Sequence, residues 1–258
     1  MKKLDIICII IGVICFLLAG YIVYSKFFKE NKIDFNKEEE IKLLDDKSID
    51  LVIIDPPYKL NLSKLKHPSS FNSYANELLD LKDGFDLKVL DLLVQKMKKI
   101  NIYIYCSKRQ VKELLEYFMN KDCNYEILTW HKMNPSPLTN NNYLPDTEYV
   151  VFAREKGVRL YGNYHTKRKY YISGVNQVDK KKWKHPTIKP LPFIENHIIN
   201  SSNEGDLILD CFAGSGTTLV GAINQNRNFI GFEINSQYYE IAKQRIKEAL
   251  ETKAGDKK

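Results

Sequence analysis

The chain has 258 residues, a formal net charge of +7 and a hydrophobic share of 44%. This length is enough for a packed core, and the modest Gly and Pro content excludes collagenous and low-complexity chains. The five cysteines are odd in number and contain no C-x-x-C pair, which argues against a disulfide framework or a cysteine-rich zinc site. We therefore expect an intracellular globular domain, whose positive charge is compatible with a polyanionic partner.

The first thirty residues depart from that composition. Residues 6–24 form an uncharged apolar run with Lys2 and Lys3 before it and further lysines after it. At about 1.5 Å per residue, a helix of this length nearly spans the ~30 Å hydrocarbon core of a membrane. We interpret residues 1–28 as an apolar helix and membrane anchor, with a signal peptide and a buried core helix as the alternatives. Residues 29–47 follow as a charged linker.

From residue 48 onward, strand-like and helix-like segments alternate along the chain. Apolar, β-branched runs predict strands at 49–54, 101–106, 125–132, 148–153, 206–209 and 229–232. Apolar residues at helical spacing predict helices at 76–99, 107–121, 191–200, 217–226 and 236–251. This alternation indicates an α/β fold, in which a doubly wound, mostly parallel sheet carries helices on both faces.

Asp55-Pro56-Pro57-Tyr58 closes the first predicted strand. Neither proline can donate a backbone hydrogen bond, so the turn is stiff and its carbonyls point outward. A carboxylate, a fixed carbonyl and an aromatic ring at one strand end suit a planar ring with an exocyclic amino group. Asp55 and the Pro56 carbonyl would accept its two N–H groups, and Tyr58 would stack on its face. The alternative is a strand stop in which Tyr58 only packs.

Residues 207–218 (LILDCFAGSGTT) have the form of a strand, a glycine turn and a helix N-terminus. Gly214 and Gly216 let the backbone approach a ligand closely. Glu233 ends the next predicted strand, where its carboxylate could accept hydrogen bonds from two ribose hydroxyls. A dinucleotide fingerprint would need glycine at the position of Leu219, and the Gly-Lys-Ser/Thr of a P-loop is absent. The alternative is a glycine turn that merely joins strand to helix.

Together these motifs resemble the amino-group DNA methyltransferases, which use S-adenosylmethionine. The resemblance covers most of residues 48–250 and rests on segments 48–58, 130–137 with 146–149, 185–190 and 210–218. A catalytic motif that precedes the cofactor motif is the permuted order of the β group of this family. The resemblance implies a seven-stranded, Rossmann-like methyltransferase sheet over residues 48–258, preceded in this chain by the apolar helix.

The resemblance also implies roles for individual residues. The catalytic residues would be Asp55, Pro56, Pro57 and Tyr58. The cofactor-binding part would be residues 185–250, with contacts from Asp210, Phe212, Gly214, Gly216, Thr217, Thr218, Glu233, Thr187 and Lys189. In this arrangement Lys189 would meet the carboxylate of the cofactor. No metal site is expected, because the histidines of the chain lack metal-ligand spacing.

A target base inside a duplex must be flipped out before its amino group can react, so the enzyme must also hold the duplex. Residues 154–189 carry eleven Lys and Arg against two acids. They overlap the region of about 133–184, where the family's recognition segment lies, and predict phosphate contacts to double-stranded DNA. The DNA-binding candidates are Arg154, Arg159, Lys167, Arg168, Lys169, Lys180, Lys181 and Lys182. The alternative is a solvated basic loop.

The expected activity is transfer of a methyl group from S-adenosylmethionine to N6 of a flipped-out adenine, in a restriction-modification or phage/host modification setting. Cytosine-N4 methylation is the close alternative, because it uses the same amino-group geometry. A third alternative is a membrane-tethered nucleic-acid-binding protein with a degenerate methyltransferase fold, suggested by residues 6–24 and by the linker. We expect the cytoplasm, or the cytoplasmic face of a membrane, as its location. A cognate restriction endonuclease and a homodimer are further partners to consider.

Overall fold

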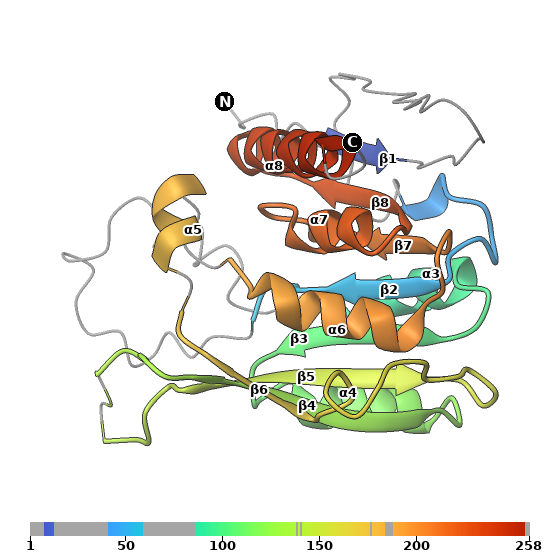
Figure 1. The fold of residues 1–258 in the computed structure, drawn as a ribbon. Helices are drawn as coiled ribbons and strands as arrows, with labels where there is room; N and C mark the ends of the chain where they lie inside the picture. The colour runs from blue at the N-terminus through green and yellow to red at the C-terminus, as the bar shows by residue number, and fades with distance from the viewer. Residues whose placement is uncertain are drawn as a thin grey trace, which may run out of the picture.

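The computed structural model describes residues 8–12, 41–58, 86–137, 139, 141–175, 177–183 and 188–255, which form one sheet with helices on both faces (Figure 1). The strands are β1 (Cys8–Gly12), β2 (Leu51–Ile54), β3 (Asn101–Cys106), β4 (Asn124–Lys132), β5 (Thr147–Arg154), β6 (Tyr170–Ser173), β7 (Leu207–Asp210) and β8 (Asn228–Glu233). The helices are α3 (Lys88–Lys96), α4 (Val111–Met119), α5 (Gln177–Trp183), α6 (Leu191–Ser201), α7 (Thr217–Asn224) and α8 (Ser236–Gly255).

The strands lie in the order β1-β8-β7-β2-β3-β5-β4-β6. β8, β7, β2 and β3 pair in parallel, whereas β5 runs antiparallel between β3 and β4. β6 is parallel to β4 at one edge, and β1 is antiparallel to β8 at the other. The predicted α/β fold with a doubly wound, mostly parallel sheet is confirmed. The described residues give it eight strands instead of the predicted seven, because β1 adds to one edge.

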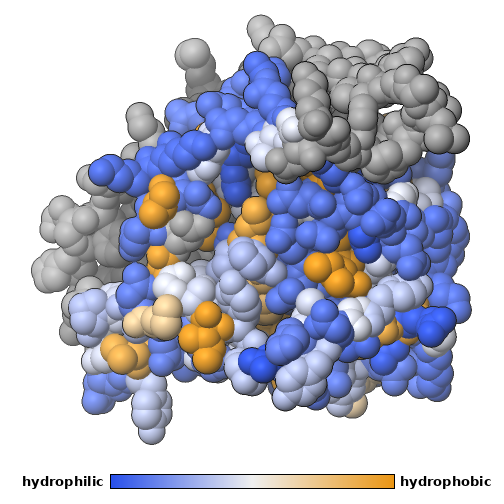
Figure 2. All heavy atoms as spheres, viewed as in Figure 1, coloured by the Kyte–Doolittle hydropathy of each residue, from blue (hydrophilic) through white to orange (hydrophobic). Residues whose placement is uncertain are grey.

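Different helices cover the two faces of the sheet because side chains alternate along each strand. In β2, Val52 and Ile54 belong to the core under α3 and α4, whereas Leu51 and Ile53 belong to the core under α6, α7 and α8. All four side chains are buried, which is why β2 is a continuous apolar run in the sequence. Figure 2 shows the outer surface of the face with α6, α7 and α8 as mostly hydrophilic, with apolar residues in separate patches.

Residues Cys8–Gly12 form strand β1, so the prediction of an apolar helix over residues 1–28 is wrong at these positions. They pair antiparallel with Phe229–Glu233 of β8. A β-branched apolar segment suits a strand, and the edge of a sheet offers unpaired backbone groups to it. The rest of the run, and the predicted linker up to residue 40, lie outside the described residues. No helix in the described ranges is both long enough and apolar enough to cross a bilayer.

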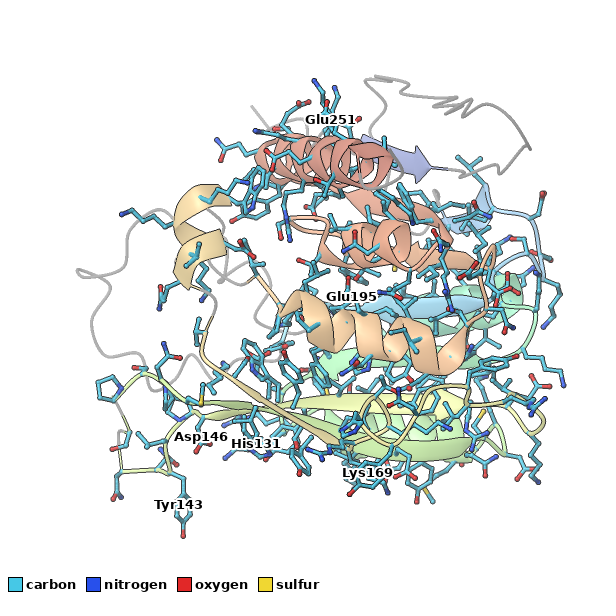
Figure 3. All side chains as sticks on the ribbon, viewed as in Figure 1. His131, Tyr143, Asp146, Lys169, Glu195 and Glu251 are labelled. Carbon is cyan, nitrogen blue, oxygen red and sulfur yellow. The ribbon has the colours of Figure 1, made fainter. Side chains whose placement is uncertain are left out.

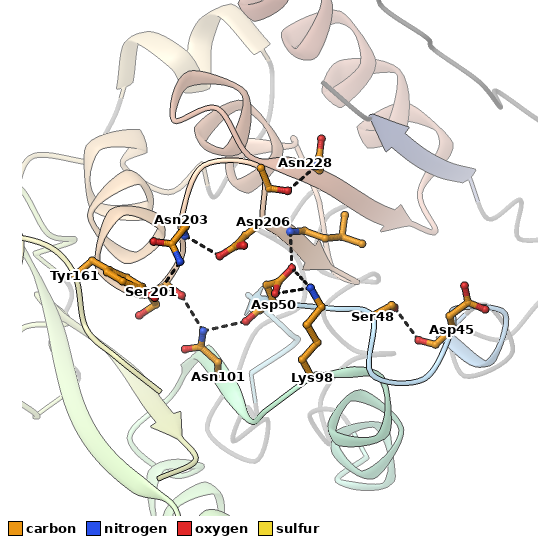
Figure 4. Close-up of polar contacts among 12 residues, drawn as sticks. Asp45, Ser48, Asp50, Lys98, Asn101, Tyr161, Ser201, Asn203, Asp206 and Asn228 are labelled. Atoms are coloured by element: carbon orange, nitrogen blue, oxygen red, sulfur yellow. Dashed lines mark hydrogen bonds and ion pairs between the residues drawn. The ribbon is translucent and has the colours of Figure 1, made fainter. Parts of the chain in front are cut away.

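Polar side chains join the amino ends of the parallel strands (Figure 4). The Asp50 carboxylate accepts hydrogen bonds from Lys98 Nζ at 2.7 Å and from the backbone N–H of Leu207 at 3.0 Å. Asn101 Nδ2 donates to the carbonyls of Asp50 and Ser201. These bonds connect the entries to β2, β3 and β7 with the end of α6. The functional motifs lie at the opposite edge, where the parallel strands end.

Candidate active site

The Asp55-Pro56-Pro57-Tyr58 motif follows β2 in the middle of the sheet. Asp55 therefore lies beside the carboxyl ends of β3 and β7, which are parallel neighbours of β2. The Tyr58 hydroxyl turns back and donates a hydrogen bond to Asp55 Oδ1 at 3.0 Å. Gln110 Nε2 donates to the carbonyl of Pro57 at 3.4 Å. A hydrogen bond between the first and last residues of the motif therefore fixes its shape, and Gln110, which precedes α4, stabilises it further.

The structure places Lys189 against the carboxylate of Asp55. Lys189 Nζ lies 2.8 Å from Asp55 Oδ2 and 2.9 Å from Glu148 Oε2, and it donates to the Tyr58 hydroxyl at 3.1 Å. Lys132 Nζ lies 2.6 Å from the other oxygen of Glu148. Lys189 is only 8% exposed. Two carboxylates and two ammonium groups thus form a compact cluster, hereafter the charge cluster, around one tyrosine hydroxyl.

Burial and neighbouring charges set the ionisation of the charge cluster. Burial raises the pKa of Asp55 above its ordinary value, although Lys189 opposes that shift. Burial acts in the same direction on Glu148, but Lys189 and Lys132 outweigh it and lower the pKa of Glu148 to about 2. For Lys189, burial favours the neutral amine, but Asp55 and Glu148 overcome it and raise the pKa. Glu148 is therefore ionised and Lys189 protonated at neutral pH.

The glycine turn lies next to this cluster, between β7 and α7. Glu233, at the end of β8, accepts hydrogen bonds from the backbone N–H of Gly214 at 2.6 Å and of Asn235 at 2.8 Å. Gly216 has a φ of +78°, and a Cβ at this position would lie 2.9 Å from the Cβ of Ala242. Both the backbone conformation and the packing against α8 therefore require glycine. Each oxygen of Glu233 keeps a lone pair for a further donor, such as a ribose hydroxyl.

Arg245 of α8 holds the same turn from the other side. Its Nη1 lies 2.8 Å from both the carbonyl and the hydroxyl oxygen of Ser215, and 2.9 Å from Thr217 Oγ1. The side chain is buried. Sequence analysis did not identify this residue. The available signal was a charged residue within the apolar stripe of the last helix, three residues after Ala242 and next to Ile246.

A pocket lies between Asp55, the first residue of the Asp55-Pro56-Pro57-Tyr58 motif, and the glycine turn. Asp55 and Lys189 line it together with Asp210, Phe212 and Gly214, and with Thr217 and Thr218 at the start of α7. Burial raises the pKa of Asp210 to about 7, against the opposing hydrogen bonds from the Thr218 hydroxyl and the backbone N–H of Phe212. The acidic acceptors fit hydroxyl and ammonium groups of a ligand. The open glycine turn at a helix N-terminus fits a negatively charged group such as a carboxylate.

Thr187, a predicted cofactor-binding residue, lies outside the described residues. Within the ranges that the structure describes, no group of three or more His, Cys, Asp or Glu side chains is arranged to hold a metal ion. His197 is a buried residue of α6, and burial lowers its pKa to about 3 and keeps the ring neutral. Its Nε2 lies 3.2 Å from the hydroxyl of Tyr105.

The eight predicted DNA-binding residues do not share one surface. We call the end of the sheet at which the parallel strands finish and Asp55 lies the catalytic edge, and the opposite end the far edge. Residues 180–182 lie on α5, which follows β6 near the catalytic edge. Lys182 Nζ pairs with Glu248 of α8 at 2.7 Å. Arg154 lies at the far edge, because it ends β5 opposite Asn101, the first residue of β3. Its Nη1 donates to the carbonyl of Val158. The lysines of α5 and Arg154 therefore lie at opposite ends of the strands.

The segment between Arg154 and α5 returns along the outer side of the sheet. The backbone N–H of Tyr161 donates to the carbonyl of Asn200 near the end of α6, which places Arg159 at the far edge as well. Lys167 and Arg168 come next in the chain and are exposed. Lys169 lies beside the middle of β4, away from Asp146 at the catalytic edge (Figure 3). Its Nζ pairs with Glu126 at 2.5 Å.

The connection from β4 to β5 lies at the catalytic edge and carries a residue that sequence analysis did not identify. Tyr143 is 99% exposed and projects away from the fold (Figure 3). Lys132, just before this connection, and Glu148, just after it, both belong to the charge cluster. An exposed aromatic ring on a connection anchored at the charge cluster is suited to contact a large planar or polymeric ligand.

Comparison with known proteins is consistent with this geometry. Residues 49–244 match the model of the N6/N4 methyltransferase family, described as DNA methylase. Type II methyltransferase M2.MboI of Moraxella bovis is 29% identical, over 86% of this chain and 87% of that protein. Type II methyltransferase M1.MboII, also of Moraxella bovis, is 31% identical over 83% of this chain and 93% of that protein.

Two solved structures share the arrangement of the sheet. The crystal structure of the M1.HpyAVI–SAM complex superposes with a TM-score of 0.60 at 27% identity, covering 81% of this chain and 96% of that chain. The PvuII DNA methyltransferase, described as cytosine-N4-specific, gives a TM-score of 0.61 at 18% identity, with 82% and 84% of the two chains covered. At that identity the second likeness shows a common fold.

Proposed function

We propose that this chain, which belongs to the N6/N4 DNA methylase family, methylates the N6 amino group of an adenine in DNA. DNA methyltransferase activity with S-adenosylmethionine as cofactor is the activity of the family. The target base is the part we propose. The observation that carries it is the carboxylate of Asp55 at the end of β2, beside the Tyr58 ring, because members of the family that act on cytosine more often have serine at this position.

The exocyclic nitrogen of adenine is a weak nucleophile because its lone pair is delocalised into the ring. Asp55 would accept one N–H of the amino group and the Pro56 carbonyl the other, which draws the lone pair out of conjugation. Asp55 would also stabilise the positive charge that develops on nitrogen. Tyr58 would stack on the flipped base. When bound, S-adenosylmethionine supplies a methyl group attached to a positively charged sulfur.

The residues around the glycine turn would hold the cofactor. Glu233 has acceptor capacity for the ribose hydroxyls. Asp210 offers a second buried carboxylate in the lining of the pocket. Gly214 and Gly216 leave the backbone open to a ligand, and Phe212 contributes an apolar contact. Thr217, Thr218 and Thr187 remain assigned to the cofactor. Lys189 was expected at the carboxylate of the cofactor, but in the structure it contacts Asp55.

We place the DNA-contacting surface at the catalytic edge. Its candidates are the lysines at 180–182 on α5 and Tyr143 on the connection between β4 and β5. Lysines contribute non-specific phosphate contacts, and an exposed tyrosine suits contact with a base or sugar. Arg154 and Arg159 lie at the far edge of the sheet, so we do not include them in this surface. Because DNA and the cofactor are found in the cytoplasm, we propose that location for the domain.

The test is methyl transfer from labelled S-adenosylmethionine to unmethylated genomic DNA by the full chain, with nucleoside analysis of the product. N6-methyladenine in the digest would support the proposal. N4-methylcytosine would retain the mechanism and replace the target base. Asp55→Ala should abolish transfer while leaving cofactor binding nearly intact, because Asp55 acts on the base. Cofactor binding by the wild type without any labelled DNA would contradict the proposal.

A further inference from the structure

Both oxygens of Asp55 are engaged in the structure. Oδ1 accepts a hydrogen bond from the Tyr58 hydroxyl, and Oδ2 accepts one from Lys189 Nζ at 2.8 Å. The Lys189 ammonium is a nitrogen with N–H donors directed at the catalytic carboxylate. It therefore competes with the amino group of the target base for Asp55 Oδ2 and for the negative charge of this carboxylate. Release by Lys189 would leave Oδ2 wholly available to the base.

Lys189 has a second carboxylate partner already in place. Its three N–H groups have three acceptors, namely Asp55, Glu148 and the Tyr58 hydroxyl. Among the residues that the structure describes, Asp55 and Glu148 are the carboxylates paired with Lys189. The rings of Tyr58 and Tyr105 lie close by, with centroids 5.4 and 5.2 Å from Nζ. Glu148 is therefore the carboxylate already in contact with the ammonium group that can hold it when it leaves Asp55.

We propose that Glu148 is a positioning residue that retains Lys189 when the target amino group replaces it on Asp55. This inference rests on the proposed function. Asp55, Glu148, Lys132 and Lys189 carry two negative and two positive charges, so a neutral amino group can enter without any charge leaving the cluster. Once Lys189 is held by Glu148 alone, the negative charge of Asp55 is available to the positive charge that develops on the substrate nitrogen.

The chain without Glu148 would behave differently. Lys189 would then have Asp55 as its single carboxylate partner and would compete with the base for it. An unpaired buried ammonium group is costly, so the Asp55–Lys189 contact would persist and mask the catalytic carboxylate. Glu148 itself has no direct contact with the reacting atoms in this scheme. It accepts a hydrogen bond from the Tyr58 hydroxyl at 3.3 Å, and Gln at this position keeps an oxygen acceptor for that bond. The proposed effect on catalysis passes through Lys189, which allows a test by double substitution.

The experiment measures kcat, the KM for DNA and the cofactor Kd of three variants of the full chain. Glu148→Gln keeps the shape of the side chain and removes its charge, and we expect kcat to fall by about tenfold or more with cofactor affinity within about twofold. Lys189→Met is measured alone, and Glu148→Gln is then combined with Lys189→Met. The double variant should recover part of the lost kcat, because the competing ammonium group is absent.

A purely structural role for Glu148 predicts the opposite result, since a second substitution in a damaged site would lower kcat further. The inference is overturned if Glu148→Gln keeps the wild-type kcat, or if the double variant is no faster than Glu148→Gln. Glu251→Gln, on the exposed side of α8, is the control for the same chemical change. Wild-type chain that transfers no methyl group would overturn the proposed function, whereas an active wild type with unaffected Glu148→Gln would overturn this inference alone.

Discussion

Arg245 Nη1 lies 2.8 Å from both the carbonyl and the hydroxyl oxygen of Ser215, thirty residues earlier in the chain. The same guanidinium lies 5.9 Å from the ring of Trp183, the buried residue of α5. Three segments therefore meet at the buried guanidinium of Arg245: the glycine turn, α8 and α5. The turn is shaped by this contact before any ligand arrives.

Replacing Arg245 should weaken the turn. Arg245→Met leaves the carbonyl of Ser215 and the hydroxyl of Thr217 without this donor, and each buried unsatisfied group costs about 1–3 kcal/mol. We expect cofactor affinity to fall about tenfold, as measured by calorimetric titration. Lys247→Met, on the exposed side of the same helix, serves as the control and should bind normally. Unchanged affinity in Arg245→Met would contradict a role in shaping the turn.

Two glycines with positive φ separate backbone strain from packing. Gly216 and Gly205 have φ values of +78° and +83°, but an added Cβ meets Ala242 at 2.9 Å in the first case and nothing within 4 Å in the second. Both alanine substitutions should cost about 1 kcal/mol of backbone strain. Gly216→Ala should lose about 1–3 kcal/mol more through overpacking. Urea unfolding of both variants measures the difference, and equal losses would refute the packing argument.

The buried carboxyl of Asp210 should make stability fall as the pH rises. Its pKa is raised from 3.8 to about 7, chiefly by burial, so between these values the folded chain retains a proton that the unfolded chain has released. Stability contributed by this group is therefore present below pH 3.8 and lost progressively up to about pH 7. Asp210→Asn removes the titration, so its stability relative to the wild type should increase over that window. Urea unfolding at several pH values, without cofactor, provides the measurement.

The lysines of α5 should contribute more to DNA binding than the basic residues beside β4. Neutralising residues 180–182 with glutamine should lower DNA affinity and reduce the slope of log K against log salt by up to about three. The same change at residues 167–169 is the matched comparison, because both triplets were predicted from the sequence and carry equal charge. Fluorescence anisotropy over a salt series measures both. A larger effect at 167–169 would move the DNA surface away from the catalytic edge.

Buried elements were predictable because their sequence carries a burial pattern. Strand β3 has the predicted bounds, and β2, β7, β8 and α6 differ by one or two residues at their ends. β6 and α5 were not predicted, since YYIS lies at an exposed edge and the QVDKKKW helix buries only Trp183. For Cys8–Gly12 an apolar run fits helix and strand alike, and the pairing with β8 decides between them.

The candidate site shows the same division. Asp55, Tyr58, Gly214 and Glu233 stand in local motifs that the sequence displays directly, and the parallel strands bring these motifs to one edge. The approach of Glu148 to Lys189 joins residues that are 41 positions apart. It depends on the antiparallel insertion of β5 between β3 and β4, which no local pattern specifies. The resemblance to the family identified segment 146–149 but assigned no role to the carboxylate of Glu148.

The polar bonds around Asp50 and Asn101 have a consequence for how such an enzyme can change its specificity. They connect the parallel strands at their amino ends, opposite the catalytic edge. Together with the buried residues on both faces of the sheet, they form the framework of the fold. The connection carrying Tyr143 and the helix α5 contribute little to that framework. A chimaera that receives these two segments from a relative should therefore keep its fold, so new target sequences can evolve by exchange of surface segments.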